Sequence, residues 1–215
     1  MLKAIIFDYN GVLVDDLIFH RDAYLRVAED LGYSISSQGI WDLISATPDE
    51  KRILFGDISD EQWKDIKARK DIYYFEMIRN GDIMLPDVEE ILLHLAKSYD
   101  LALVSNTARS YFEEVFPSRL SACFKTTLFA GEINPPKPAP QPLYKAMDIL
   151  GVTQGECCYV GDSTSDAEMT QRAGVTMLGI TTGHHSGQAL KEAGAEYIVD
   201  NLKDLADKIK GYPSL

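Results

Sequence analysis

The sequence predicts an α/β protein with a doubly wound, Rossmann-like parallel sheet core and a small helical domain inserted after the first strand. Short continuous apolar runs alternate with helical patterns through residues 86–215. Such runs are typical of strands that are buried on both faces of a parallel sheet. Residues 15–85 instead carry helical periodicity without a strand pattern. We therefore expect residues 1–14 and 86–215 to form the core, and residues 15–85 to form the insert.

Six apolar runs are the expected strands. The four clearest are residues 3–7, 101–104, 157–160 and 176–180, and two weaker ones are residues 126–129 and 197–199. Helical patterns lie between them at residues 88–98, 110–116, 141–150, 165–173, 187–193 and 202–209. Because strand and helix alternate, right-handed crossovers and a parallel sheet follow.

The insert begins with a helix in which Leu17, Tyr24, Val27 and Leu31 repeat at helical spacing, and which Gly32 ends. Two short helices are expected at residues 40–44 and 49–55. A long helix through residue 79 would be capped by Asp60, with an apolar side formed by Trp63, Ile66, Tyr73 and Met77. Hinges to the core are expected near residues 14–16 and 81–86.

The composition indicates an ordinary globular protein with an acidic surface. Of the 215 residues, 46% are hydrophobic and 25% charged, and 21 basic against 33 acidic residues give a formal net charge of −12. Nucleic-acid binding needs a basic surface to neutralise phosphates, and anionic membranes attract basic segments. Neither nucleic acid nor a membrane is therefore expected as a partner. An anionic small ligand would need a local positive centre or a metal ion.

The sequence also favours a cytoplasmic protein. No apolar run reaches the length of about 18 residues that suggests a membrane span, and residues 3–7 are too short for a signal peptide. Cys123, Cys157 and Cys158 have no metal-binding spacing and are odd in number. We expect free thiols in a reducing compartment and a monomer or homodimer.

Polar side chains follow the ends of the expected strands. They are Asp8, the pair Ser105 and Asn106, Lys137, Asp162 and Asp166. In an open α/β sheet, ligands bind outside the carboxyl ends of the strands, at a topological switch point. Acids, small polar groups and one lysine gathered there suit phosphoryl chemistry with a hard divalent cation.

These segments resemble the haloacid-dehalogenase-like (HAD) hydrolase superfamily. The first is similar to Asp-x-Asp-Gly-Val/Thr-Leu-x-Asp and begins at Asp8, and the second ends a strand in Ser105-Asn106. The third is Lys137 with the following proline, and the fourth is similar to Gly-Asp-Ser-x-x-Asp, with Asp162 and Asp166. All four stand in the family's order across nearly the whole chain.

The resemblance implies a role for each residue of the site. Asp8 would be the nucleophile that takes the phosphoryl group. Asp162 would be the main acidic ligand of Mg²⁺, beside Asp8 and the main-chain carbonyl of Asn10. Asp166 would hold a metal-bound water or orient the loop, and Lys137 would neutralise the charge that Asp8 shares with the phosphoryl group. That group would be bound by Ser105 and by backbone N–H groups near Gly11 and Asn106.

Asn10 departs from the family pattern, because the phosphatases usually carry a second aspartate there as the general acid and base. An amide cannot perform either proton transfer. Three readings stay open: an engineered Asp-to-Asn change made to trap substrate, a natural residue with weak hydrolysis, or a binding protein on an enzyme fold.

The insert resembles the cap domain of the phosphoglycolate phosphatase and β-phosphoglucomutase branch. His20, in a segment similar to the first cap helix, is a candidate substrate-binding residue. Lys51 and Arg52 could bind a second anionic group, although a solvated face is the simpler reading. His184 and His185 are expected in a loop near the site, without enough ligands for a metal site of their own.

Together these inferences predict a Mg²⁺-dependent phosphatase that acts on a small phosphorylated metabolite through an aspartyl-phosphate on Asp8. The alternatives are a catalytically weak protein that binds a phosphate ligand, and a sugar-phosphate mutase. Gly161 favours the phosphatase, because the mutase branch tends to place a second acid at this position.

Overall fold

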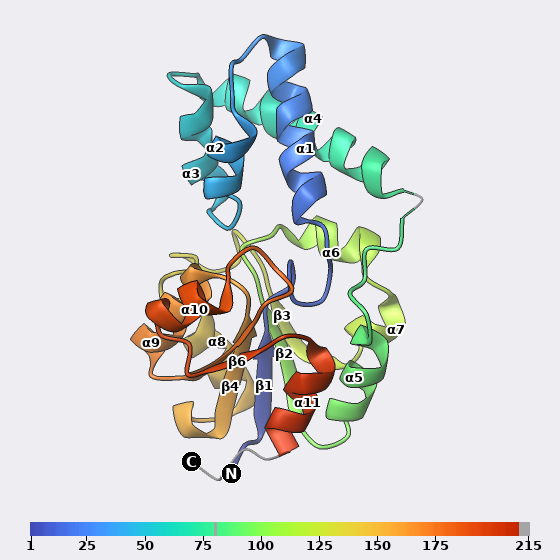
Figure 1. The fold of residues 1–215 in the computed structure, drawn as a ribbon, viewed down its shortest axis with the longest axis vertical. Coiled ribbons are helices and arrows are strands. Elements are labelled where there is room, and N and C mark those ends of the chain that lie inside the picture. The colour runs from blue at the N-terminus through green and yellow to red at the C-terminus, as the bar shows by residue number, and fades with distance from the viewer. Residues whose placement is uncertain (80, 211–215) are drawn as a thin grey trace. The chain divides into compact units, whose positions relative to one another are not determined.

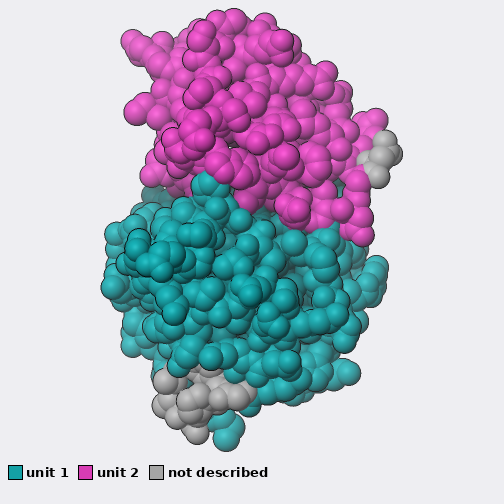
Figure 2. Space-filling view, viewed as in Figure 1, with its two compact units in different colours: residues 1–14, 84–215 teal, residues 15–83 magenta. Residues whose placement is uncertain are grey.

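The chain forms two compact units in the computed structural model, which describes residues 1–79 and 81–210. Unit 1 comprises residues 1–14 and 84–215, and unit 2 comprises residues 15–83 (Figure 2). Residues 211–215, the end of the expected core, lie outside the described residues. All named strands belong to unit 1, whereas the named elements of unit 2 are helices.

Unit 1 is built on a sheet whose strands pair in parallel (Figure 1). In the described residues its order is β3-β2-β1-β4-β5-β6. The strands are β1 (Ala4–Phe7), β2 (Asp100–Val104), β3 (Phe124–Leu128), β4 (Cys157–Gly161), β5 (Thr176–Ile180) and β6 (Tyr197–Val199). The order reverses between the neighbours β1 and β4, which makes their carboxyl ends the switch point. The predicted α/β class and doubly wound parallel sheet are confirmed.

Helices follow the strands of unit 1 in the alternation that the sequence predicts. They are α5 (Val88–Leu95), α6 (Arg109–Val115), α7 (Ser118–Ser121), α8 (Gln141–Leu150), the short η2 (Gln154–Glu156), α9 (Thr164–Ala173), α10 (Gly187–Ala193) and α11 (Leu202–Lys210). The helix α7 is not foreseen in the sequence.

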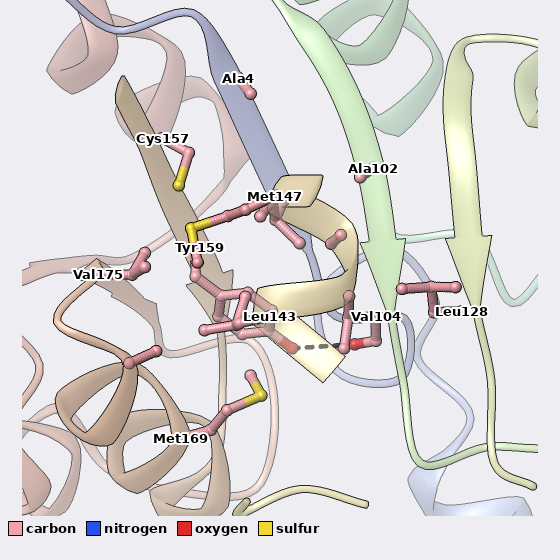
Figure 3. Packing of buried hydrophobic residues seen from close by; sticks show 13 residues of the cluster. Ala4, Ala102, Val104, Leu128, Leu143, Met147, Cys157, Tyr159, Met169 and Val175 are labelled. Atoms are coloured by element: carbon pink, nitrogen blue, oxygen red, sulfur yellow. Dashed lines mark hydrogen bonds between the residues drawn. The ribbon is translucent and has the colours of Figure 1, made fainter. Parts of the chain in front are cut away.

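One face of the sheet packs against α8 and α9 in a core of buried side chains (Figure 3). Ile6 of β1 lies opposite Tyr159 of β4 in the parallel register, so both contribute to this face. Leu143 from α8 and Met169 from α9 cover them, and each of the four is fully buried. Figure 3 shows the Tyr159 hydroxyl directed at the Val104 carbonyl, which accepts its hydrogen bond over 3.0 Å. A polar atom thus ends this apolar layer.

Unit 2 is a helical unit with its own core. Its elements are α1 (Leu17–Leu31), α2 (Ser37–Asp42), α3 (Pro48–Lys51), η1 (Arg52–Phe55) and α4 (Asp60–Ile78). Gly32 ends α1 with a left-handed φ of 76°, as expected. The core includes Tyr24, Ile40, Phe55 and Trp63.

Two details of α4 differ from expectation. Ser59, not Asp60, is the N-cap residue, because its hydroxyl accepts the N–H of Gln62 and the Gln62 side chain accepts the N–H of Ser59. The buried side continues through Lys70, Tyr74 and Ile78, one position beyond the Tyr73 and Met77 read from the sequence. Because the charged Lys70 occupies a buried position, the sequence pattern does not show which side of α4 is buried.

Within the described residues, no helix has the length and apolar character needed to cross a membrane. The three cysteines are free, and Cys157 and Cys158 are buried in β4.

Candidate active site

Three buried carboxyl groups meet at the carboxyl edge of the sheet in unit 1. Asp8 directly follows β1, Asp162 directly follows β4, and Asp166 lies in the first turn of α9. One carboxylate oxygen from each lies within 4.8 Å of those of the other two. Because β1 and β4 are neighbours, the fold brings together side chains that are far apart in the sequence.

Lys137 joins this cluster from the loop before α8. Its Nζ lies 2.8 Å from Oδ2 of Asp8 and 2.8 Å from Oδ1 of Asp166, and the side chain is buried. Asn106 holds the lysine backbone on both sides: its Oδ1 accepts the N–H of Lys137, and its Nδ2 donates to the carbonyl, each over 3.1 Å. The Asn106 side chain therefore positions Lys137.

Burial and mutual repulsion set the electrostatics of the cluster. Burial, with a further contribution from Asp166, raises the pKa of Asp8 to about 6 against the opposing effect of Lys137. Burial and the charges of Asp166 and Asp8 raise the pKa of Asp162 well above its usual range. For Lys137, burial lowers the pKa, but the two carboxylates beside it outweigh this effect and raise it. Lys137 thus forms ion pairs with two carboxyl groups of a cluster of three, so its single positive charge does not balance the cluster.

A divalent cation fits this set of donors. Hard cations such as Mg²⁺ prefer carboxylate oxygens, and Asp8 and Asp162 present theirs at the same edge of the sheet. A bound cation would offset the desolvation and repulsion that raise the pKa values of both groups.

Asp166 is held mainly by protein donors. Its Oδ2 accepts the hydroxyl of Ser163 over 2.6 Å and the N–H of Ser163 over 3.1 Å, which completes the capping box of α9. Its Oδ1 faces Lys137 at 2.8 Å and Tyr159 Oη at 3.0 Å. This arrangement suits the orienting role considered for Asp166.

The turn after β1 is tied together by its own backbone and by Thr107. The N–H of Tyr9 donates to Oδ1 of Asp8 over 2.7 Å. Gly11 has a left-handed φ of 74°, and its N–H donates to the carbonyl of Val14 over 2.8 Å. The hydroxyl of Thr107 donates to Oδ1 of Asn10. The Gly11 N–H, expected to bind the phosphoryl group, is thus engaged within the turn, and Asn10 lies beside the loop that follows β2.

Ser105 starts that loop and is buried at the end of β2. Its N–H donates to the Leu128 carbonyl over 2.9 Å, which extends the pairing with β3. Its hydroxyl oxygen accepts the N–H of Thr107 over 3.2 Å. The loop is thereby fixed at the same edge of the sheet as the carboxyl groups.

His20 lies in unit 2, within a buried polar network of that unit. Its Nδ1 is 2.6 Å from Nζ of Lys70, its Nε2 is 3.2 Å from Oδ2 of Asp16, and its ring stacks on Tyr74. Burial, with the charge of Lys70, lowers the pKa of His20 to about 4, and burial lowers the pKa of Lys70 to about 7. Lys51, also in unit 2, donates to the Ala46 carbonyl.

Sequence reasoning missed two contributions to the site. Tyr159, in an apolar run, reads as a core residue, yet its hydroxyl accepts a hydrogen bond from Lys137 Nζ over 3.2 Å. The loop after β5 reaches Asp162, because the N–H of His184 donates to its Oδ2 over 3.0 Å. The adjacent His184 and His185 suggested a place near the site, but backbone contacts leave no mark in a sequence pattern.

Comparisons with known proteins agree with this geometry. Residues 5–180 match the family described as haloacid dehalogenase-like hydrolase. A phosphoglycolate phosphatase from Photorhabdus laumondii is 27% identical, over 100% of this chain and 94% of its own length. A haloacid dehalogenase-like hydrolase structure from Bacteroides fragilis is 25% identical with a TM-score of 0.82, and covers 95% of this chain and 100% of its own.

A structure of CbbY from Rhodobacter sphaeroides has a TM-score of 0.79 at 21% identity, covering 95% of this chain and 96% of its own. It is an Asp-to-Asn mutant in complex with xylulose-1,5-bisphosphate. At this identity the likeness shows the fold alone. The family match spans most of the chain, and this protein therefore belongs to the haloacid dehalogenase-like hydrolases.

Proposed function

We propose that the chain is a Mg²⁺-dependent phosphomonoester hydrolase that forms an aspartyl-phosphate on Asp8. The observation that carries this proposal is the position of Lys137, which bridges Asp8 and Asp166 at 2.8 Å from each, next to Asp162. A buried cation beside a buried carboxylate can keep that carboxylate ionised and can also offset the charge of an incoming phosphate.

In the first step an oxygen of Asp8 attacks phosphorus, and the bond from phosphorus to the ester oxygen breaks. The Tyr9 N–H and Lys137 hold the two carboxylate oxygens, so the nucleophile is oriented before substrate arrives. Ser105 is the candidate for binding the transferred oxygens from the neighbouring strand end. A bound Mg²⁺, held by Asp8, Asp162 and the main-chain carbonyl of Asn10, would supply charge stabilisation for those oxygens.

In the second step water attacks the phosphorus of the acyl phosphate, which releases inorganic phosphate and restores the Asp8 carboxylate. Both steps move a proton: the leaving oxygen gains one and the attacking water loses one. The amide of Asn10 can do neither, although its Oδ1 accepts the Thr107 hydroxyl as a carboxylate oxygen could. We therefore propose slow turnover for this chain.

We propose a small phosphorylated metabolite as the substrate. The Photorhabdus relative is named for phosphoglycolate, and the CbbY mutant holds a sugar bisphosphate. Both ligands carry a second anionic group besides the reacting phosphate. We propose unit 2 as the cap domain that recognises this group, with His20 as a substrate-binding residue. Lys70 is buried beside His20. Lys51 and Arg52 stay the candidates for binding the second anionic group.

The same proposal places the protein in the cytoplasm, as a monomer or homodimer.

The mutase alternative is weakened by Gly161, because a Cβ atom there would lie 2.7 Å from atoms of Asp166. An acidic side chain at that position would displace Asp166. The binding-protein alternative rests on Asn10 alone.

The test measures hydrolysis of p-nitrophenyl phosphate and phosphoglycolate, with Mg²⁺ and with EDTA, by the present chain, Asn10→Asp and Asp8→Asn. We expect Mg²⁺-dependent phosphate release that Asn10→Asp increases and Asp8→Asn abolishes. If the present chain and Asn10→Asp both bind phosphate but neither hydrolyses the substrates, the result would instead favour the binding protein. A raised KM for phosphoglycolate, but not for p-nitrophenyl phosphate, in His20→Gln would support the role of His20.

A further inference from the structure

The loop that joins β5 to α10 makes two hydrogen bonds to the site. The hydroxyl of Thr182 donates to the Gly11 carbonyl over 2.6 Å, and the N–H of His184 donates to Oδ2 of Asp162 over 3.0 Å. Gly161 of β4 pairs with Gly179 of β5, so the loop leaves the sheet beside the end of β4. We name residues 182–184 the β5 loop clamp.

Between these two bonds, the clamp lies close against the Asp162 carboxylate. A Cβ atom built on Gly183 would lie 1.9 Å from Oδ2 and 2.3 Å from Cγ of Asp162, well inside any permitted contact. A Cβ atom on Gly11 would lie 2.6 Å from the same oxygen. The backbones of two glycines therefore both approach the Asp162 carboxylate closely, and the Thr182 bond ties those two segments together.

We propose that the β5 loop clamp is a positioning element that fixes the rotamer of Asp162 for binding the divalent cation. The inference rests on the proposed metal-dependent function. Asp8, Asp162 and Asp166 have oxygens within 4.8 Å of one another, and like charges at such separations repel. A backbone N–H on Oδ2 and the close backbones of Gly11 and Gly183 restrain the carboxylate from turning away from that repulsion. The partners of a ligating carboxylate typically change metal affinity 10- to 100-fold when they are lost.

Gly183→Ala tests the steric part of the clamp. Gly183 does not have a left-handed backbone, so alanine introduces a clash with Asp162 without strain in φ. We expect Mn²⁺ affinity, measured by the EPR signal of free Mn²⁺ and checked for Mg²⁺ by calorimetry, to fall at least 10-fold. The matched control is Gly155→Ala, since Gly155 also lacks a left-handed φ and a Cβ atom there meets nothing within 4 Å. It should bind Mn²⁺ as the unchanged chain does.

Substitutions of Thr182 test its hydrogen bond to the Gly11 carbonyl. They can refute the inference even if Gly183→Ala does not fold. Thr182→Val removes the donor to the Gly11 carbonyl at nearly constant volume and should weaken Mn²⁺ binding about 10-fold. Thr182→Ser keeps the donor and should bind Mn²⁺ as the unchanged chain does.

Two outcomes separate the possible failures. If the unchanged chain binds neither Mn²⁺ nor Mg²⁺, the proposed metal site is wrong and the clamp with it. If the unchanged chain binds Mn²⁺ and both Gly183→Ala and Thr182→Val bind it equally well while folded by circular dichroism, the metal site stands and the clamp is refuted.

Discussion

The hydroxyl of Tyr159 lies 3.2 Å from Nζ of Lys137, at the end of an otherwise apolar layer of the sheet. The same hydroxyl lies 3.0 Å from Oδ1 of Asp166, and it donates a hydrogen bond to the Val104 carbonyl over 3.0 Å. Lys137 thus has Asp8, Asp166 and Tyr159 around a single ammonium group. A neutral acceptor from the core, and not only the two carboxylates, fixes where the positive charge stands.

Tyr159→Phe should therefore weaken both the site and the fold. Removing the hydroxyl takes away the donor to the Val104 carbonyl and one partner each of Lys137 and Asp166, which costs about 1–3 kcal/mol of unfolding free energy. A loosened Lys137 should also lower kcat, by up to about 10²-fold if the ammonium group moves by about 1 Å. Urea unfolding and the pH profile of kcat measure the two effects. In the control Tyr144→Phe, an exposed hydroxyl is lost, and stability should change by no more than about 0.5 kcal/mol.

Asp8→Ala and Asp162→Ala should each abolish phosphatase activity while the protein stays folded. Both residues stand after the ends of strands, so neither change leaves a hole in the apolar layer, and Asp162→Ala relieves repulsion within the cluster. Phosphate release and far-UV circular dichroism give the two readouts. Full turnover by either variant would remove the residue from the proposed machinery, and loss of the circular dichroism signal would show a structural role.

Mg²⁺ should raise Tm, EDTA should reverse the rise, and the gain should grow between pH 5 and pH 8. Asp8 has a pKa of about 6 in the folded chain against 3.8 unfolded, so the stability that its protonated form contributes is fully present below about pH 4. Between about pH 4 and pH 6 the unfolded state has released the proton that the metal-free native state still holds, so stability falls over this range and levels off once native Asp8 is ionised. A cation binds the ionised form and restores stability, by about 2.7 kcal/mol at a concentration of 100 times Kd.

Thermal scans in Mg²⁺ and in EDTA at each pH give this difference directly. A constant difference from pH 5 to pH 8, or none at all, would contradict binding at these carboxyl groups. Asp162→Ala provides the control, because it should lose the Mg²⁺ effect at every pH.

Most site residues that the sequence predicts were found because they directly follow the expected strands. Asp8 and Asp162 follow apolar runs that are buried on both faces, and the neighbouring positions of β1 and β4 then bring them together. The contacts of Tyr159 and Gly183 were not predictable in this way. Tyr159 fits an apolar strand as well as any aromatic residue does, and its polar role depends on which atoms lie at the tip of its ring. The role of Gly183 is an absence of side chain opposite Asp162, which appears only once two distant loops are placed in space.

The helical insert shows the limit of periodicity. Lys70 lies on the buried side of α4, so the apolar stripe read from the sequence shifted to Tyr73 and Met77. Lys70 tolerates burial because its amine meets the His20 ring, which no local pattern indicates.

His20→Gln should remove an acid sensitivity of the folded protein. His20 has a pKa of about 4 in the fold against 6.5 in the unfolded chain, because it is buried and faces Lys70. Below pH 6.5 the unfolded state binds a proton that the native state refuses, so stability falls as pH drops from 6.5 to 4. The full difference is about 3 kcal/mol at about 1.4 kcal/mol per pKa unit.

Urea unfolding at pH 6.5 and pH 4.5 measures this loss. It should be smaller in His20→Gln than in the unchanged chain, whereas His94→Gln, at an exposed position on α5, should leave it as it is. An equal loss in His20→Gln would show that His20 is protonated in the fold.

The last prediction concerns Asn10, which occupies the position where the family's phosphatases usually have an aspartate as general acid and base. Asn10→Asp should raise turnover of an alkyl phosphate such as phosphoglycolate by about 10²- to 10⁴-fold, the usual contribution of general acid–base catalysis. Asparagine and aspartate are nearly isosteric, and the Thr107 hydroxyl that donates to Oδ1 of Asn10 can donate equally to a carboxylate, so the loop should keep its shape. An aryl phosphate should gain less, because its leaving group needs little protonation. The gain that remains there would come from hydrolysis of the aspartyl-phosphate, whose attacking water still needs a base. In the present chain, p-nitrophenyl phosphate should therefore leave a phosphoryl group on Asp8, visible as a mass increase that Asp8→Asn removes. Equal turnover of both substrates by both forms would show that residue 10 is not the missing proton-transfer group.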